Sequence, residues 1–108
     1  MTLGELIRAL EKEPDRQLEV GFGNPHSYRG WYEQLAFEPM EDTTVAAMLR
    51  EARGALGVTF TGWKGGEYQM SEHTDCHLAY MGRIGQELSP LALKALLSGI
   101  VSISDFQD

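Results

Sequence analysis

The apolar residues change their spacing between residues 10 and 18, and this change limits the folds that the chain can adopt. Up to residue 10 they recur every three or four positions, as on one face of a helix, at Leu3, Leu6, Ile7 and Leu10. After residue 17 they alternate, as on the buried face of a strand, at Leu18, Val20 and Phe22. A helix and a strand that each bury one face are stable when they pack together, so the sequence predicts helices on a sheet.

Both patterns recur along the rest of the chain, separated by capping and turn-forming residues. Thr2 and Glu5 have the spacing of a capping box, and Ser89-Pro90 combines an N-cap with a first-turn proline. Pro14 and Pro39 are expected to end the first helix and the second strand. Helices are predicted over residues 3–13, 45 to 54 or 57, and 91–99, and strands over residues 17–22, 31–39, 57–63, 67–70, 76–80 and 100–104, with a loop over residues 21–30.

The predicted elements contain the order helix–strand–strand twice. Residues 2–10 align with residues 44–52, which raises the hypothesis of an internal duplication. We predict one domain over residues 1–108 with an α+β fold, in which helices cover one face of a largely antiparallel sheet. The expected core consists of the strand residues Leu18, Val20, Phe22, Leu35, Phe37, Val58 and Phe60 and the helix residues Leu6, Ile7, Leu10, Met48 and Leu49.

Composition limits the partners and the compartment of the chain. Its 16 acidic and 9 basic residues give a formal charge of −7 at pH 7, which opposes non-specific binding to nucleic acid or anionic membranes. The lone Cys76 cannot form an intrachain disulfide and fits a reducing compartment. The N-terminus lacks the basic start and apolar run of a secretion signal, and no apolar run reaches the roughly 18 residues of a membrane span. We therefore expect a cytoplasmic protein without a membrane partner.

Polar and aromatic residues crowd into residues 26–32, where folding has no evident need of them. If the strand begins near Arg29, its alternation places Arg29 and Glu33 on the same face of the strand as Leu35, which is expected to face the core. A charge on that side requires a partner or access to water. Two interpretations follow, a structural Arg29–Glu33 pair at the rim of the sheet or the mouth of a pocket in which Arg29 binds an anion.

A second cluster surrounds the predicted turn at Gly65 and Gly66. These glycines permit positive φ and a close approach of the backbone to a ligand, although a plain β-turn would contain them as well. Neither this turn nor residues 21–23 have the glycine spacing of a nucleotide-binding motif. The two clusters together supply the cations and aromatic rings that bind a compact anionic aromatic molecule. The predicted ligand-binding residues are His26, Tyr28, Arg29, Tyr32, Trp63, Lys64, Gly65, Gly66 and Tyr68.

A third candidate is the run of residues 73–78, which contains two imidazoles, a carboxylate and a thiol. On a strand, His73 and His77 would lie about 13 Å apart, too far to share a metal ion. Cys76 and His77 would point to opposite faces, which argues against a thiol–imidazole catalytic pair. We expect Cys76 or His77 to be a core or sheet-surface residue, and we predict no metal, cofactor or catalytic residue.

Two segments of the chain resemble a known family. The segment HSYRG-x-Y, which starts at His26, and the segment GWKGGEY, which ends at Tyr68, are similar to segments shared by small proteins of bacteriophages and prophages. The resemblance covers roughly residues 2–80, and the ending LSPLALKALLSG departs from it. It implies a phage-related context, in which accessory proteins counter host defence by sequestering a signalling nucleotide or by blocking a defence protein. The matching residues are His26, Ser27, Tyr28, Arg29, Gly30, Tyr32, Lys64, Gly65, Gly66, Glu67 and Tyr68.

Three classes of function remain open. We predict a phage-related anti-defence protein of the host cytoplasm that binds and sequesters a small anionic nucleotide-like ligand without turnover. The alternative is an inhibitor that blocks a host defence complex, as an anti-CRISPR protein or nuclease antagonist, through its acidic surface. An enzyme is the least favoured class, because no nucleophile, metal site or general-base constellation is recognisable.

The last predicted helix is apolar on nearly all sides, since Lys94 is the one polar residue within residues 91–97. A chain of this length has little interior in which to surround such a helix. We therefore predict a homo-oligomer, most simply a twofold dimer, whose interface contains Leu91, Leu93, Leu96 and Leu97.

Overall fold

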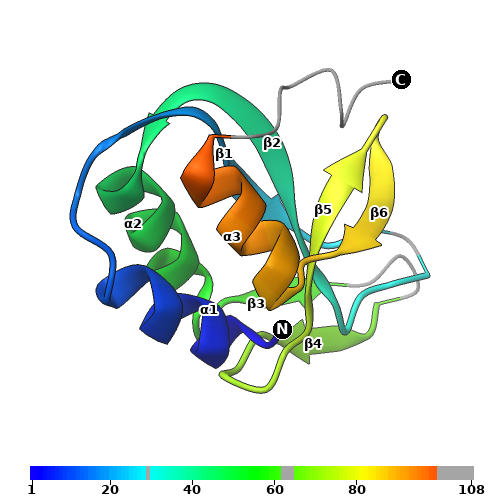
Figure 1. Ribbon diagram of the computed structural model, residues 1–108. Helices are drawn as coiled ribbons and strands as arrows, with labels where there is room; N and C mark the ends of the chain where they lie inside the picture. Colours follow the sequence, from blue (N-terminus) through cyan, green and yellow to red (C-terminus); the bar gives the residue numbers. More distant parts are fainter. Residues whose placement is uncertain (29, 62–64, 100–108) are drawn as a thin grey trace.

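The computed structural model describes residues 1–28, 30–61 and 65–99. These residues contain three helices and six strands (Figure 1). The helices are α1 (Leu3–Glu11), α2 (Val45–Ala55) and α3 (Pro90–Ser98). The strands are β1 (Gln17–His26), β2 (Leu35–Thr44), β3 (Thr59–Thr61), β4 (Glu67–Gln69), β5 (Cys76–Tyr80) and β6 (Arg83–Glu87). The predicted α+β class is confirmed, and β6 is a strand that the sequence did not predict.

Each helix begins at a side chain that satisfies its free backbone N–H groups. Thr2 and Glu5 form the predicted capping box, in which the Thr2 hydroxyl accepts from the Glu5 backbone and the Glu5 carboxylate accepts from the Thr2 backbone. Thr44 and Ser89 each accept from the backbone N–H three residues further on, at 3.0 and 3.1 Å. The helix starts were therefore predictable from local sequence.

Four strands form the main sheet in the order β1-β2-β5-β6. The pairs β1–β2 and β5–β6 are antiparallel and β2–β5 is parallel, so the sheet is largely antiparallel, as predicted. β3 and β4 pair antiparallel in a separate two-stranded sheet, which confirms the predicted hairpin. The order helix–strand–strand occurs twice, although the two hairpins belong to different sheets. The predicted strand over residues 100–104 lies outside the described residues.

The β1–β2 hairpin differs most from the prediction. β1 continues to His26 through residues that were predicted as a loop, and β2 begins at Leu35 instead of residue 31. The segment between them is a turn, in which the backbone N–H groups of Trp31 and Gln34 donate to the carbonyls of Tyr28 and Trp31 at 2.9 and 3.0 Å. The strand alternation proposed from Arg29 onward is therefore wrong for residues 30–34.

Pro39 does not end β2, contrary to the prediction. It pairs with Phe22 in the β1–β2 ladder, and β2 continues to Thr44. β5 pairs with β2 only from Leu35 to Phe37, so the missing proline N–H interrupts no ladder with β5. A proline is therefore tolerated where one edge of the strand has no partner strand among the described residues.

The buried side chains form a core in which the rings of Phe22 and Phe37 lie 4.9 Å apart. Val58 was predicted in this core but is 39% exposed, because it precedes the small hairpin and lies outside the main sheet. Three other predicted residues, Ile7, Leu49 and Phe60, are partly buried and pack against the core. The predicted residues that are buried are Leu6, Leu10, Leu18, Val20, Phe22, Leu35, Phe37 and Met48.

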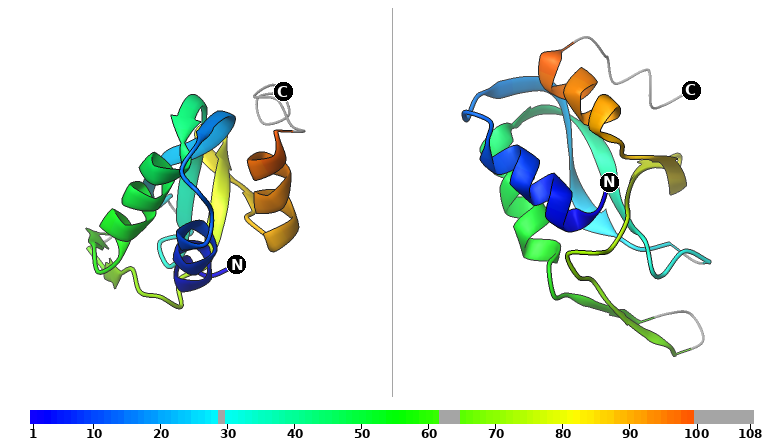
Figure 2. Two further views of the ribbon diagram at one scale, coloured as in Figure 1. Left: turned by 60° about the vertical axis from the view of Figure 1, so that its left-hand side comes forward. Right: turned by 60° about the horizontal axis from the view of Figure 1, so that its bottom comes forward.

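The helices flank the sheet closely, and the small hairpin projects from it. The strands lie between α2 and α3 in the left view of Figure 2, so the helices do not all cover one face of the sheet as predicted. The right view shows the β3–β4 hairpin extending away from the helices. Glycine at position 21 permits the approach of α2, since a Cβ there would lie 2.8 Å from the Met48 sulfur. In α3, Leu93 and Leu96 are buried in the core of the chain itself, which corrects their predicted place in an interface between copies.

Candidate ligand-binding cleft

The turn after β1 presents side chains that the sheet does not use. Gly30 has φ +85°, and the residues after it reverse the chain before β2 begins. Trp31 and Glu33 are exposed, whereas Tyr32 and Gln34 are half-buried. Glu33 therefore does not face the core as predicted, because it belongs to a turn and not to a strand.

Tyr32 of this turn stacks on Tyr68 of β4. The two ring centroids lie 5.5 Å apart and the ring planes are inclined by 19°, a separation typical of offset aromatic pairs. Gly66 lies close to the hydroxyl end of the Tyr68 ring, because a Cβ at that position would lie 3.2 Å from the hydroxyl oxygen and 3.3 Å from the nearest ring carbon. The stack joins the two sequence clusters at Tyr32, Gly66 and Tyr68, as predicted from the residue types.

A cleft of about 490 Å³ opens beside the stacked rings. This volume falls within the range of about 300–1,000 Å³ that small-molecule sites occupy. Trp31 contributes a large ring that is 50% exposed and is therefore available for contact with a ligand. The lining residues are Gly30, Trp31, Tyr32, Glu33, Gln34 and Tyr68.

His77 of β5 contacts the wall of this cleft. Its Nε2 lies 3.1 Å from the Gln34 side-chain oxygen, and its ring centroid lies 6.4 Å from that of Trp31. Since Ala36 and His77 are paired in the parallel ladder, the register between β2 and β5 determines this contact. The sequence predicted Cys76 or His77 as a core or sheet-surface residue and did not connect His77 with residues 30–34.

Two predicted site residues, His26 and Tyr28, form a separate cluster at the end of β1. The His26 Nδ1 lies 2.8 Å from the Asn24 carbonyl oxygen, and its Nε2 lies 3.9 Å from the Glu38 carboxylate. The rings of His26 and Tyr28 meet edge to face at 4.5 Å. Burial, and then the Glu38 charge, raise the pKa of the Tyr28 hydroxyl. Neither ring lines the cleft.

Gly65 is the remaining predicted site residue that the structure describes. Gly65 has φ +88°, the positive backbone angle that was expected at this turn. Arg29, Trp63 and Lys64 lie outside the described residues. Trp31, Glu33 and Gln34 line the cleft but were missed as site residues, because the strand interpretation assigned them to the faces of a sheet.

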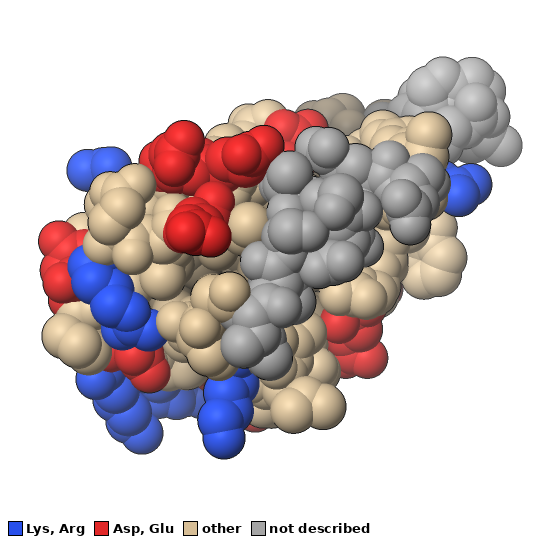
Figure 3. Space-filling view, turned by 45° about the horizontal axis from the view of Figure 1, so that its top comes forward, with Lys and Arg blue, Asp and Glu red and all other residues tan. Residues whose placement is uncertain are grey.

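Charge is unevenly distributed over the molecule. Residues 17–44 contain the carboxylates of Glu19, Glu33, Glu38, Glu41 and Asp42, and Arg29 is their one Lys or Arg residue. On the face shown in Figure 3, acidic side chains gather along the upper part and basic side chains at the lower left. Arg16 and Arg53 form ion pairs with Glu13 and Glu11, at 3.1 and 2.6 Å.

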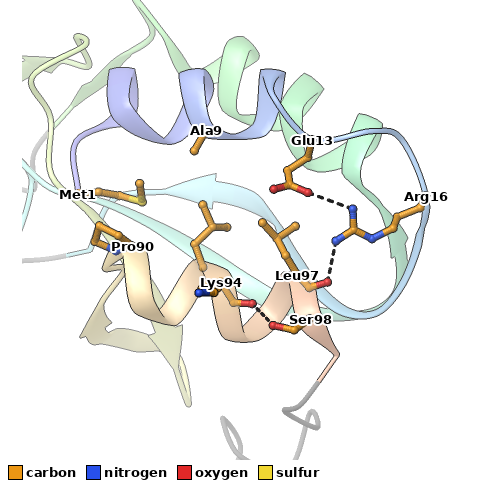
Figure 4. A pocket seen from close by; sticks show the side chains of 9 residues that line it. Met1, Ala9, Glu13, Arg16, Pro90, Lys94, Leu97 and Ser98 are labelled. Atoms are coloured by element: carbon orange, nitrogen blue, oxygen red, sulfur yellow. Dashed lines mark hydrogen bonds and ion pairs between the residues drawn. The ribbon is translucent and has the colours of Figure 1, made fainter.

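A second cavity, of about 350 Å³, lies between α1 and α3 (Figure 4). Its walls are mainly aliphatic and include Ala9, Leu93 and Leu97. Arg16 at its rim donates to Glu13 and to the Leu97 carbonyl, so these donors already have partners. The cavity has no aromatic wall among its lining residues and is less suited to a planar ligand than the cleft at Tyr32.

The run of residues 73–78 does not form a reactive cluster. Cys76 is fully buried, as expected of a core residue, and burial raises the pKa of its thiol to about 12. His73 is exposed and lies 3.3 Å from its neighbour Glu72. Within the described ranges, no three His, Cys, Asp or Glu side chains come together as metal ligands.

Comparisons with family models, curated proteins and solved structures find no match to this chain. The resemblance to phage proteins therefore stays a prediction. Among the described helices, none has the length and apolarity needed to cross a membrane.

Proposed function

We propose that this chain is a binding protein that holds a small planar ligand in the aromatic cleft without turnover. The observation that carries this function is the stack of Tyr32 on Tyr68, because it joins a turn and a strand that are distant in the sequence beside a cleft of ligand size. Trp31 adds a half-exposed ring to the same cleft. Aromatic side chains stabilise a stacked base by about 1–3 kcal/mol each, so such a cleft favours planar ligands.

The ligand is proposed to be anionic and nucleotide-like. This part of the proposal depends on Arg29 and Lys64, which directly precede Gly30 and Gly65 in the sequence. A guanidinium and an ammonium are the usual donors to phosphate in a protein that is otherwise acidic. In the phage-related context that the resemblance implies, sequestration of such a nucleotide in the host cytoplasm would counter a defence signal.

The titratable groups support binding in preference to catalysis. The raised pKa of Cys76 leaves little thiolate near neutral pH, so this buried thiol is a poor nucleophile.

The first prediction tests the tyrosine stack. Replacing Tyr68→Ala removes a ring from the cleft, and we expect the Kd of the bound nucleotide to rise about 5- to 150-fold. Native mass spectrometry of protein purified from a host with active defence systems identifies a retained ligand, and calorimetry with nucleoside monophosphates measures Kd.

The matched control for this prediction is Tyr68→Phe, which keeps the ring and removes only the hydroxyl group. It should bind almost as tightly as the wild type, because stacking uses the ring face. Equal affinity of wild type and Tyr68→Ala for every nucleotide would contradict the proposed cleft.

A second candidate function is the blocking of a basic defence protein, and the acidic residues of the β1–β2 hairpin favour it. Glu19, Glu41 and Asp42 are exposed, and no described residue forms an ion pair with them. Charge complementarity of this kind increases the association rate with a basic surface.

A further inference from the structure

His77 carries a buried nitrogen that constrains the side chain of Gln34. Its Nδ1 is buried and has no hydrogen-bond partner among the described residues. Its Nε2 lies 3.1 Å from the Gln34 Oε1. A neutral imidazole has one nitrogen that donates and one that accepts. The difference between a paired Nε2 and an unpaired Nδ1 therefore indicates which nitrogen carries the proton.

The proton of His77 belongs on Nε2. If Nδ1 carried it, a buried N–H group would have no acceptor, and buried N–H groups without partners are rarer in proteins than acceptors with unused capacity. With the proton on Nε2, the ring donates to Gln34 Oε1, and Nδ1 is only an unused acceptor. His77 therefore orients the amide of Gln34.

This orientation determines what Gln34 offers to the cleft. Its oxygen is engaged by His77, so its amide NH₂ group remains available to donate to a ligand. The neighbouring Glu33 lines the same cleft and offers two carboxylate oxygens that only accept. The wall formed by Glu33 and Gln34 thus combines a donor with a double acceptor beside the aromatic rings.

We infer that the cleft selects a guanine-type base, whose edge carries a carbonyl oxygen followed by two N–H donors. The carbonyl oxygen accepts from the Gln34 amide, and the ring and exocyclic N–H groups donate to the Glu33 carboxylate. An adenine edge offers that carboxylate one N–H group beside a nitrogen lone pair, which the second carboxylate oxygen repels. This inference rests on the proposed ligand-binding function and adds the class of base.

Calorimetry with GMP, AMP and guanosine tests the base preference of the wild-type chain. We expect GMP to bind about 5- to 150-fold more tightly than AMP, the range for a good bidentate contact to the correct base. Guanosine should bind more weakly than GMP, because it has the same base but lacks the phosphate group. Equal Kd values for GMP and AMP that both rise in Tyr68→Ala would overturn this inference alone, whereas no binding of any nucleotide would overturn the proposed function as well.

Two variants separate selection from folding. Glu33 is exposed, so Glu33→Gln should leave the melting temperature unchanged and bring the Kd values for GMP and AMP close to each other. His77→Phe keeps a ring beside Trp31 but removes the donor to Gln34, and it should reduce the same preference while AMP affinity stays near the wild-type value. A purely structural His77 would change both affinities equally, and that result would exclude its role as a positioning residue.

Discussion

At the scale of single residues, two glycines show how strongly the surroundings determine the effect of one methyl group. A Cβ on Gly21 in β1 would clash with the Thr43 methyl group of β2 and would lie 2.8 Å from the sulfur of the fully buried Met48 in α2, closer than packed atoms normally approach. A Cβ on Gly54 in α2 would meet nothing within 4 Å. The first glycine permits α2 to pack on the sheet, whereas the second only reduces helix propensity.

Opposite effects on stability are therefore expected from alanine at these two positions. Gly21→Ala should lower the free energy of unfolding by about 1–3 kcal/mol, as overpacking of a core does. Gly54→Ala should raise it by about 0.5–1 kcal/mol, because alanine restricts the unfolded chain and favours helix. Urea unfolding measures both, and an unchanged midpoint in Gly21→Ala would show that neither Thr43 nor Met48 packs closely against Gly21.

At the scale of elements, α3 buries part of its apolar surface inside the chain itself. Leu93 and Leu96 are buried inside the chain, so half of the predicted interface is already used. Leu91 is 78% exposed, and Leu97 is partly buried at the cavity beside α1. The surface of α3 that could contact a second copy is therefore smaller than predicted and is centred on Leu91.

The predicted homo-oligomer can be tested on that surface. Leu91→Glu places a charge on the exposed side of α3, and we expect it to convert the oligomer, a twofold dimer in the simplest case, into a monomer. Leu56→Glu is the matched control, because Leu56 is 48% exposed but lies at the end of α2. Light scattering gives the mass in each case, and a monomeric wild-type chain would refute the prediction.

At the scale of the whole molecule, the separation of charge determines which partners are attracted. The acidic residues of the β1–β2 hairpin have few basic neighbours in sequence, whereas in α1 and α2 three arginines balance three glutamates, namely Arg8, Arg50 and Arg53 with Glu5, Glu11 and Glu51. Such a distribution attracts basic surfaces toward the hairpin, and the attraction is screened by salt.

If the chain blocks a basic defence nuclease, inhibition should weaken as salt increases. The double variant Glu41→Gln, Asp42→Asn should inhibit less and with a smaller salt dependence, because two exposed charges of the hairpin are removed. Glu72→Gln, which removes an exposed charge outside the hairpin, is the control. Inhibition that is insensitive to salt would contradict this second candidate function.

The sequence by itself determined the features that depend on neighbours along the chain. The capping side chains Thr2 and Ser89 predicted the starts of α1 and α3, because a cap acts within three residues. The alternation of Leu18, Val20 and Phe22 predicted a buried strand face for the same local reason.

Only the tertiary structure decided the ends of the β1–β2 hairpin and the composition of the cleft. Pro39 is tolerated inside β2 because β5 pairs with β2 only as far as Phe37. The local sequence does not determine that register. Tyr32 meets Tyr68, and Gln34 meets His77 across 43 positions, because the small hairpin and the parallel strand β5 return to the same turn. Contacts of this kind depend on the packing of distant elements, so residue types predicted the aromatic cluster but not its hydrogen-bonding wall.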